Sequence, residues 1–270
     1  ADGFPVTRVG PGADGIVPAE AIAAALRPET GLVTVMAANH EIGTLQPIGA
    51  IGAVTRARGI LFHSDAAQAA GKVPLDVVAA KVDLMSLSAH KMYGPKGIGA
   101  LYVRRGVTVE PLLAGGGQER GLRSGTVATP LAVGFGAAAA IAGAEMGREG
   151  ERLAALRDRL LDRLRAAIPG LAVNGALAPR LPQNLDVRLP GIVAVDLLHR
   201  LKDHVAVSAG SACASATLEP SPVLRAIGLD DDAALGSIRI GLGRWTSEAE
   251  VDAAAAAIAG VWRRLALSPA

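Results

Sequence analysis

The chain of 270 residues contains a single cysteine, Cys213. One cysteine cannot form a disulfide within the chain, so a disulfide-stapled extracellular domain is excluded and a reducing cytoplasm is expected. Aromatic residues make up only 3% of the chain, so the core must be aliphatic. Lysine is also scarce, since only five of the 27 basic residues are lysine. Because lysine rather than arginine serves as an amine nucleophile, covalent chemistry at an amine has few candidates.

Charge and hydropathy exclude further classes of protein. The net charge is +2 and no dense run of Lys and Arg accompanies it, so nucleic acid is not an expected partner. No apolar stretch approaches the roughly 20 residues that a membrane helix needs, and the first residues carry no export signal, so we expect no membrane association. Half of the residues are hydrophobic and 19% are charged, which is typical of a folded globular chain.

Short apolar runs alternate with helical stretches in the first half of the chain. This alternation predicts an α/β fold whose mostly parallel sheet is covered by helices on both faces. In such sheets ligands bind at the carboxyl ends of the strands. The predicted strands are Leu32–Ala37, Ile60–His63, Asp83–Leu87 and Gly99–Val103, and the predicted helices are Pro18–Arg27 and Pro47–Arg58.

A Gly-rich segment, Gly106–Thr126, predicts a long functional loop. A helix is expected over Leu131–Ile168, with a break at Gly147 and Gly150 that separates a large domain (1–146) from a smaller α+β domain (147–270). The strands expected in the second domain are Leu171–Asn174, Asn184–Leu189, Val205–Ser208 and Ser237–Leu242, and its helices are Val193–Asp203, Pro220–Ile227 and Ser247–Leu265.

Two side chains follow predicted strands. Lys91 lies in a loop marked by Gly94 and Pro95, where an amine could bind an aldehyde cofactor; an exposed lysine in a turn is the alternative. Asp65 ends another strand, where its carboxylate could hold a pyridine nitrogen protonated or could cap a helix.

Two more candidates lie in the second domain. Cys213 stands in a run of small residues, Ser208–Ala216, which favours an exposed nucleophile over a buried structural thiol. Arg239 interrupts a buried strand pattern and requires an anionic partner, which is either a ligand carboxylate or an internal acid.

Taken together and in order, these motifs resemble the cysteine desulfurases, which are fold-type I pyridoxal-phosphate enzymes of the class-V aminotransferase group. The loop with Cys213, followed by Leu218-Glu219-Pro220, is similar to that of the iron–sulfur-assembly branch. The matching stretches cover nearly the whole chain and are Asn39–Thr44, His63–Gln68, Ser88–Gly97, Gly115–Thr126, Ser208–Pro220 and Ser237–Thr246.

The resemblance implies pyridoxal 5'-phosphate as cofactor and assigns each candidate a role. Lys91 would hold the cofactor covalently and carry protons, and His90 also counts among the catalytic residues. The remaining contacts of the cofactor would be made by Asp65 at the pyridinium nitrogen, Gln68 and His40 at the phenolic oxygen, Ser88 and His90 at the phosphate, and Thr126 at the phosphate of the other subunit of a homodimer.

The resemblance also implies the reaction. Arg239, with Asn39 and His40, would bind the carboxylate of L-cysteine. Cys213 would attack the substrate sulfur and leave as a persulfide, with L-alanine as the other product. An acceptor or scaffold protein would take the sulfur for iron–sulfur clusters or thio-cofactors. No resident metal is expected, although Cys213 could ligate a transient iron–sulfur cluster.

Two features depart from the family pattern. His40 stands where a second asparagine is usual, and we expect its imidazole to substitute for the amide. Ala1 matches a point well inside the family's large domain, so that domain is expected to be incomplete and these 270 residues alone to bind cofactor poorly. The alternatives are a selenocysteine lyase, another class-V aminotransferase, and an inactive fragment or docking partner.

Overall fold

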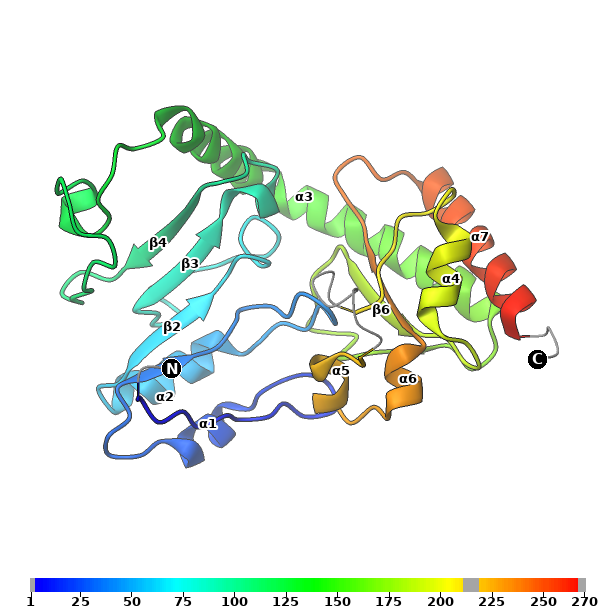
Figure 1. The fold of residues 1–270 in the computed structure, drawn as a ribbon, viewed down its shortest axis with the longest axis horizontal. Helices are drawn as coiled ribbons and strands as arrows, with labels where there is room; N and C mark the ends of the chain where they lie inside the picture. Colours follow the sequence, from blue (N-terminus) through cyan, green and yellow to red (C-terminus); the bar gives the residue numbers. More distant parts are fainter. Residues whose placement is uncertain (1–2, 211–218, 267–270) are drawn as a thin grey trace. The chain divides into compact units, whose positions relative to one another are not determined.

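The computed structural model describes residues 3–210 and 219–266, and the chain divides into two compact units (Figure 1). Unit 1 comprises Ala1–Ala25, Ala38–Pro47 and Gly147–Ala270, and unit 2 comprises Leu26–Ala37 and Ile48–Met146. The sequence interpretation assigned all of residues 1–146 to one domain, whereas the structure groups two early segments with the C-terminal residues. The chain therefore crosses between the units several times.

Unit 2 is built on a four-stranded sheet with the strand order β1-β2-β3-β4. Figure 1 labels β2, β3 and β4 of this sheet. The strands are β1 (Leu32–Thr34), β2 (Leu61–Asp65), β3 (Leu84–Ser88) and β4 (Gly99–Val103). The first three are parallel, and β4 is antiparallel to β3. The predicted α/β class is confirmed, with a mixed sheet, and all four predicted strands form.

One face of this sheet is buried and the other carries polar side chains. Phe62 and Met85 are almost completely buried on the first face. Helix α2 (Ile48–Ala57) packs against β2. A Cβ atom at Gly52 would lie 2.0 Å from the carbonyl oxygen of Ala80, so only glycine allows the helix to approach so closely. The residues that alternate with Phe62 along β2, including Asp65, belong to the second face.

Asp83, just before β3, joins several elements of unit 2. Its buried carboxylate accepts hydrogen bonds from Arg56 Nη2 (2.8 Å), Arg104 Nε (2.5 Å) and the backbone nitrogen of Phe62 (2.8 Å). These contacts link α2, β2 and the end of β4 and satisfy a charge that would otherwise be costly to bury.

Helix α3 (Thr129–Ala167) runs for 39 residues without interruption, so the expectation that the helix breaks at Gly147 and Gly150 is wrong, although unit 2 ends at Met146 and unit 1 resumes at Gly147. Two glycines cost a helix only about 1 kcal/mol each. Beyond them Leu153 and its neighbours pack into a core, and Glu149 forms an ion pair with Arg244 at 2.7 Å. These contacts outweigh the local preference.

The first part of α3 also corrects the expectation that no apolar stretch is long enough to form a membrane helix. By length and composition α3 could cross a membrane, and only 11% of its most apolar 18-residue window is buried in the structure. A single such helix is weak evidence for a membrane span, because core helices pass the same test. Within unit 2, Ala138 and Ala142 of α3 pack against Ala70 and Met92.

Unit 1 contains a three-stranded antiparallel sheet in the order β5-β6-β7. The predicted strand Val205–Ser208 is wrong, since only Ser208 forms a bridge, with Arg239 of β7. Helix α6 was not predicted. The elements of unit 1 are β5 (Ala172–Val173), β6 (Asn184–Arg188), β7 (Ser237–Gly241), α1 (Ala19–Ala25), α4 (Ala194–Leu201), α5 (Pro222–Ala226), α6 (Asp231–Leu235), α7 (Glu248–Ala266) and the second part of α3.

An aliphatic core holds unit 1 together, as the scarcity of aromatic residues predicts. Leu160 and Leu164 of α3 pack in one buried cluster with Leu185 of β6, Ile238 of β7 and Ile258 of α7. On the surface, α3 and α7 are joined by ion pairs of Asp252 with two arginines of α3.

Candidate functional site

In unit 2 the candidate residues gather at one edge of the sheet. Asp65 is the last residue of β2 and Ser88 the last of β3, and these neighbouring strands are parallel, so both residues lie at the same carboxyl edge. The 3-10 helix η1 (Ala89–Met92) begins directly after β3 and carries His90 and Lys91. Lys91 and Asp65 therefore belong to the same edge of the same sheet.

The side chains at this edge are open to solvent or partly so. Asp65 is exposed, and its Oδ1 accepts a hydrogen bond from the backbone nitrogen of Ala67 at 2.8 Å, which fixes the turn after β2. Gln68 follows in that turn and is half-buried. Ser88 Oγ and His90 Nδ1 are hydrogen-bonded at 2.9 Å. This leaves the edge with a carboxylate, an amide, a hydroxyl and an imidazole.

Lys91 lies next to a well-defined turn. Its side chain is exposed, and η1 ends at Tyr93 in the left-handed conformation (φ 65°). The ammonium group of Lys72 lies 4.1 Å from the centroid of the Tyr93 ring, which fixes that ring by a cation–π interaction. Thr126 is also exposed and lies just before α3, at the end of the Gly-rich loop.

His63, which precedes Asp65 by two positions in β2, connects three strands. Its Nδ1 is hydrogen-bonded to Thr34 Oγ1 of β1 at 2.7 Å, and its Nε2 to Ser86 Oγ of β3 at 2.8 Å. Burial lowers the pKa of His63 below its ordinary value, and the charge of Asp65 opposes this effect. The sequence interpretation gave His63 no role, although the His–x–Asp spacing places both side chains on one face.

In unit 1, Arg239 of β7 contacts the segment around His40. Nη1 of Arg239 donates a hydrogen bond to the backbone oxygen of His40 at 2.9 Å. The side chain of His40 is 41% exposed. Asn39 is buried, and its Oδ1 accepts hydrogen bonds from the backbone nitrogens of Glu41 (2.8 Å) and Ile42 (3.0 Å), so this oxygen shapes the turn.

A buried polar group lies beneath this turn. Asp186 is opposite Arg239 in the β6–β7 pairing, and Asn174 Nδ2 donates to Asp186 Oδ1 at 2.7 Å. Burial raises the pKa of Asp186 to about 7 and lowers that of Arg180 to about 10. Nη2 of Arg180 donates to the backbone oxygen of Ile42 at 2.6 Å, so this buried cation helps to hold the turn.

Cys213 lies outside the described residues. Among the described candidates, the structure brings together Asp65, Gln68, Ser88, His90 and Lys91 in unit 2, and Asn39, His40 and Arg239 in unit 1.

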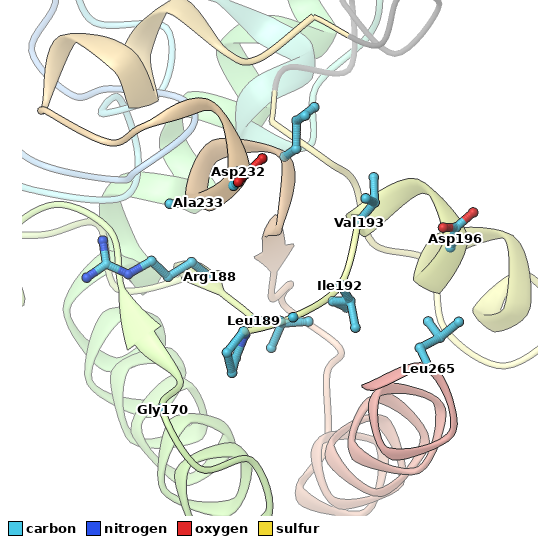
Figure 2. A pocket seen from close by; sticks show the side chains of 12 residues that line it. Gly170, Arg188, Leu189, Ile192, Val193, Asp196, Asp232, Ala233 and Leu265 are labelled. Carbon is cyan, nitrogen blue, oxygen red and sulfur yellow. The ribbon is translucent and has the colours of Figure 1, made fainter. Parts of the chain in front are cut away.

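A separate pocket of about 620 Å³ opens on unit 1 (Figure 2). It lies between the end of β6, the start of α4, α6 and the end of α7, and none of the candidate residues lines it. Its charged lining side chains are Arg188, Asp196 and Asp232, and its larger apolar ones include Leu189, Ile192, Val193 and Leu265.

Three comparisons with known proteins agree. The model of the family named aminotransferase class-V matches residues 1–254. A protein named cysteine desulfurase IscS from Stutzerimonas stutzeri is 55% identical over 256 residues, which cover 94% of this chain and 63% of that protein. The chain thus spans less than two thirds of the length of this relative.

Solved structures give the same result. A structure named NifS-like protein matches with a TM-score of 0.88 and 36% identity, over 96% of this chain and 68% of that one. A structure of SspA in complex with cysteine matches with a TM-score of 0.75 and 37% identity, over 91% of this chain and 68% of that one. The family model matches almost the whole chain, and the fold is similar to that of the NifS-like protein. The chain therefore belongs to the class-V aminotransferase family.

Proposed function

We propose that this chain forms the larger part of a cysteine desulfurase, which converts L-cysteine to L-alanine and passes the sulfur to an acceptor protein. The single observation that supports this most strongly is the 55% identity to a cysteine desulfurase over 94% of the chain. The sheet edge that gathers Lys91, Asp65 and Ser88 also supports it.

The residues at that edge fit pyridoxal 5'-phosphate. An aldehyde needs an amine, which Lys91 supplies; a pyridinium nitrogen needs a carboxylate, which Asp65 supplies. A phosphate needs hydrogen-bond donors, which the hydroxyl of Ser88 and the imidazole of His90 can supply. These two side chains lie together at the edge, because they are hydrogen-bonded to each other. In our proposal Gln68 and His40 bind the phenolic oxygen.

When bound, pyridoxal phosphate supplies a ring that stabilises negative charge on the substrate carbon. Lys91 holds this ring and then moves protons at the substrate carbons, because an amine that is freed from the cofactor can both accept and donate a proton. Asp65 keeps the ring nitrogen protonated through its negative charge. His90, beside Lys91 in η1, helps to hold the phosphate.

Arg239, with Asn39 and His40, orients the substrate by its carboxylate, since a guanidinium can donate two parallel hydrogen bonds. The thiolate of Cys213 attacks the substrate sulfur, the carbon–sulfur bond breaks, and its electron pair stays on carbon, which takes up a proton. One thiol and one cysteine thus become one persulfide on Cys213 and one alanine, with no external oxidant or reductant.

The proposal extends to assembly and location. Thr126 contacts the phosphate held by the other subunit of a homodimer. The protein is cytoplasmic, and the persulfide passes to a sulfur-acceptor or scaffold protein for iron–sulfur cluster or thio-cofactor assembly.

The experiment compares residues 1–270 with a chain extended to the length of its relatives, each mixed with pyridoxal phosphate and L-cysteine. We expect the extended chain to produce equal amounts of alanine and sulfide in the presence of a thiol reductant. Cys213→Ala should bind the cofactor but lose sulfide release.

Three results would contradict the proposal. Transamination that survives in Cys213→Ala would indicate a different class-V aminotransferase. Turnover of selenocysteine but not of cysteine would indicate a selenocysteine lyase. An extended chain that binds no cofactor would indicate a docking partner.

A further inference from the structure

Tyr93 has a backbone conformation that a bulky residue rarely adopts. It ends η1 with φ 65° and ψ 17°, in the left-handed region, and it lies two positions after Lys91. Such a conformation costs free energy and persists only where the surrounding structure enforces it, and strain of this kind is concentrated in active sites. The contacts that hold Tyr93 therefore indicate what this turn does.

The backbone of η1 closes on itself at this point. The nitrogens of Tyr93 and Gly94 both donate to the backbone oxygen of Ala89, the second at 2.9 Å. A Cβ atom at Gly94 would lie 2.9 Å from that same oxygen and 3.1 Å from the Cβ atom of Ala138 in α3. The turn that carries Lys91 is therefore packed tightly, both within itself and against α3.

Lys72 contacts the ring of Tyr93 from a different loop. Its ammonium group lies 4.1 Å from the ring centroid, and the residue is half-buried. The preceding residue, Gly71, has a φ of 70°, and a Cβ atom there would lie 2.8 Å from the Cβ of Ala142 and 3.4 Å from that of Met92. Lys72 is thus held on a turn that is itself packed against η1 and α3.

The contact joins the two loops that carry the candidate residues of unit 2. The β2 loop (residues 66–72) begins directly after Asp65, and the β3 loop (residues 89–94) contains Lys91. Because β2 and β3 are parallel neighbours, both loops leave the sheet at its carboxyl edge. A cation–π contact at a partly exposed site changes an equilibrium constant by about fivefold, so it favours one placement of the β2 loop relative to the β3 loop.

We propose that Lys72 and Tyr93 are positioning residues, which tie the β2 loop to the β3 loop. The pair sets the spacing between the amine of Lys91 and the carboxylate of Asp65. This inference rests on the proposed function. The aldehyde and the ring nitrogen of pyridoxal phosphate lie on opposite sides of one rigid ring, so the amine and the carboxylate must be spaced to match it. A contact that holds this spacing in advance strengthens binding, because less freedom is lost when the cofactor binds.

The test uses the chain extended to the length of its relatives, to which pyridoxal phosphate is added. Absorbance near the edge of the visible range follows the covalent attachment of the cofactor to Lys91. Lys72→Met keeps an apolar chain of similar length but removes the charge. It should lower the rate constant of attachment and raise the dissociation constant of the cofactor, each at least threefold. Lys72→Arg keeps a cation and should match the wild type.

Variants of Tyr93 test the other side of the contact. Tyr93→Phe keeps the ring and should match the wild type, whereas Tyr93→Leu removes the ring and should behave like Lys72→Met. The double variant of Lys72→Met and Tyr93→Leu should be no worse than Tyr93→Leu alone, because both changes remove one contact.

The matched control is Lys96→Met, which removes an exposed lysine that follows in the same part of the chain. It should leave both cofactor constants unchanged. Hydrogen exchange in the absence of cofactor provides a second readout. The amides of Tyr93 and Gly94, which donate to Ala89, should exchange faster in Lys72→Met than in the wild type and in the control.

Cofactor constants within twofold of the wild type in a folded Lys72→Met protein would overturn the inference. A loss in Lys72→Arg as large as in Lys72→Met would do the same, and so would a loss in Tyr93→Phe, which would assign the effect to the hydroxyl. If Tyr93→Leu does not fold, the two Lys72 variants decide. A wild-type protein that binds no pyridoxal phosphate would instead overturn the proposed function, so the two failures are distinguishable.

Discussion

The backbone oxygen of His40 accepts a hydrogen bond from the guanidinium of Arg239, a residue 199 positions later in the chain. The contact uses the main chain of position 40, so it does not depend on which side chain stands there. The expected replacement of an asparagine by His40 therefore leaves this contact of the proposed carboxylate clamp in place. What changes is the group that His40 presents beside it, which is an imidazole instead of an amide.

We expect Arg239→Lys to raise KM for cysteine at least tenfold. Lysine keeps the positive charge, but it cannot donate two parallel hydrogen bonds to a carboxylate, and it would lose the contact with His40. Steady-state kinetics of alanine formation measure the effect. Arg200→Lys, an exposed arginine of α4, is the control, and an unchanged KM in Arg239→Lys would contradict the clamp.

We expect Lys91→Ala to abolish covalent cofactor binding. An imine between Lys91 and an aldehyde absorbs near the edge of the visible range, and borohydride reduction would fix it to the chain. Mass spectrometry of the reduced protein should find the label on the peptide with Lys91. Lys96→Ala, which removes another exposed lysine of the same loop, should keep the label. Label on the peptide with Lys96 instead would contradict the prediction that Lys91 is the amine that binds the cofactor.

Asp186 should make unit 1 less stable as the pH rises. Its pKa is about 7 in the folded state and about 3.8 when unfolded, so between these values the folded state retains a proton that the unfolded state has lost. The free energy of unfolding should then fall by up to about 4 kcal/mol from pH 4 to pH 7 and stay level above.

Asp186→Asn should flatten this dependence, because the amide oxygen can still accept from Asn174. Urea unfolding followed by tryptophan fluorescence measures it, since Trp245 and Trp262 both belong to unit 1. Equal slopes against pH in the wild type and the variant would contradict the prediction.

His63 should affect unit 2 in the opposite direction. Its pKa is lowered in the folded state, so the unfolded state binds the proton more readily, and stability should fall as the pH drops below about 6.5. Nuclear magnetic resonance of the imidazole should give a titration midpoint below 6.5. His63→Gln should remove the acid sensitivity of hydrogen exchange in β2. A midpoint at or above 6.5 would contradict the effect of burial.

The strands of unit 2 were predictable because each is a short apolar or β-branched run, and such runs are typical of buried strands. Helix α3 was predictable in extent but not in continuity. Gly147 and Gly150 favour a helix break through a local effect. The contacts that outweigh it, which are the packing of Leu153 in the core and the Glu149–Arg244 ion pair, involve residues distant in sequence.

The sequence of helix α6 contains an N-cap residue, Asp230, that could have predicted this helix. Asp230 accepts a hydrogen bond from the backbone nitrogen of Ala233 at 2.8 Å, a typical N-cap, but five residues carry too little periodicity to stand out. For the candidate site, motif order identified Lys91, Asp65 and Arg239 as residues of interest. It gave no means to find that Glu41 meets Ser221, because that contact joins segments 180 residues apart.

Gly52 carries a consequence for anyone who screens variants of this chain. Any larger residue there would collide with the carbonyl of Ala80 and force α2 away from the turn that contains Ala80. A library scored only by loss of function would rank this position with Lys91, although Gly52 is a buried residue in the packing of α2. Intolerance to replacement in such a library would therefore map tight backbone packing as faithfully as it maps reactivity.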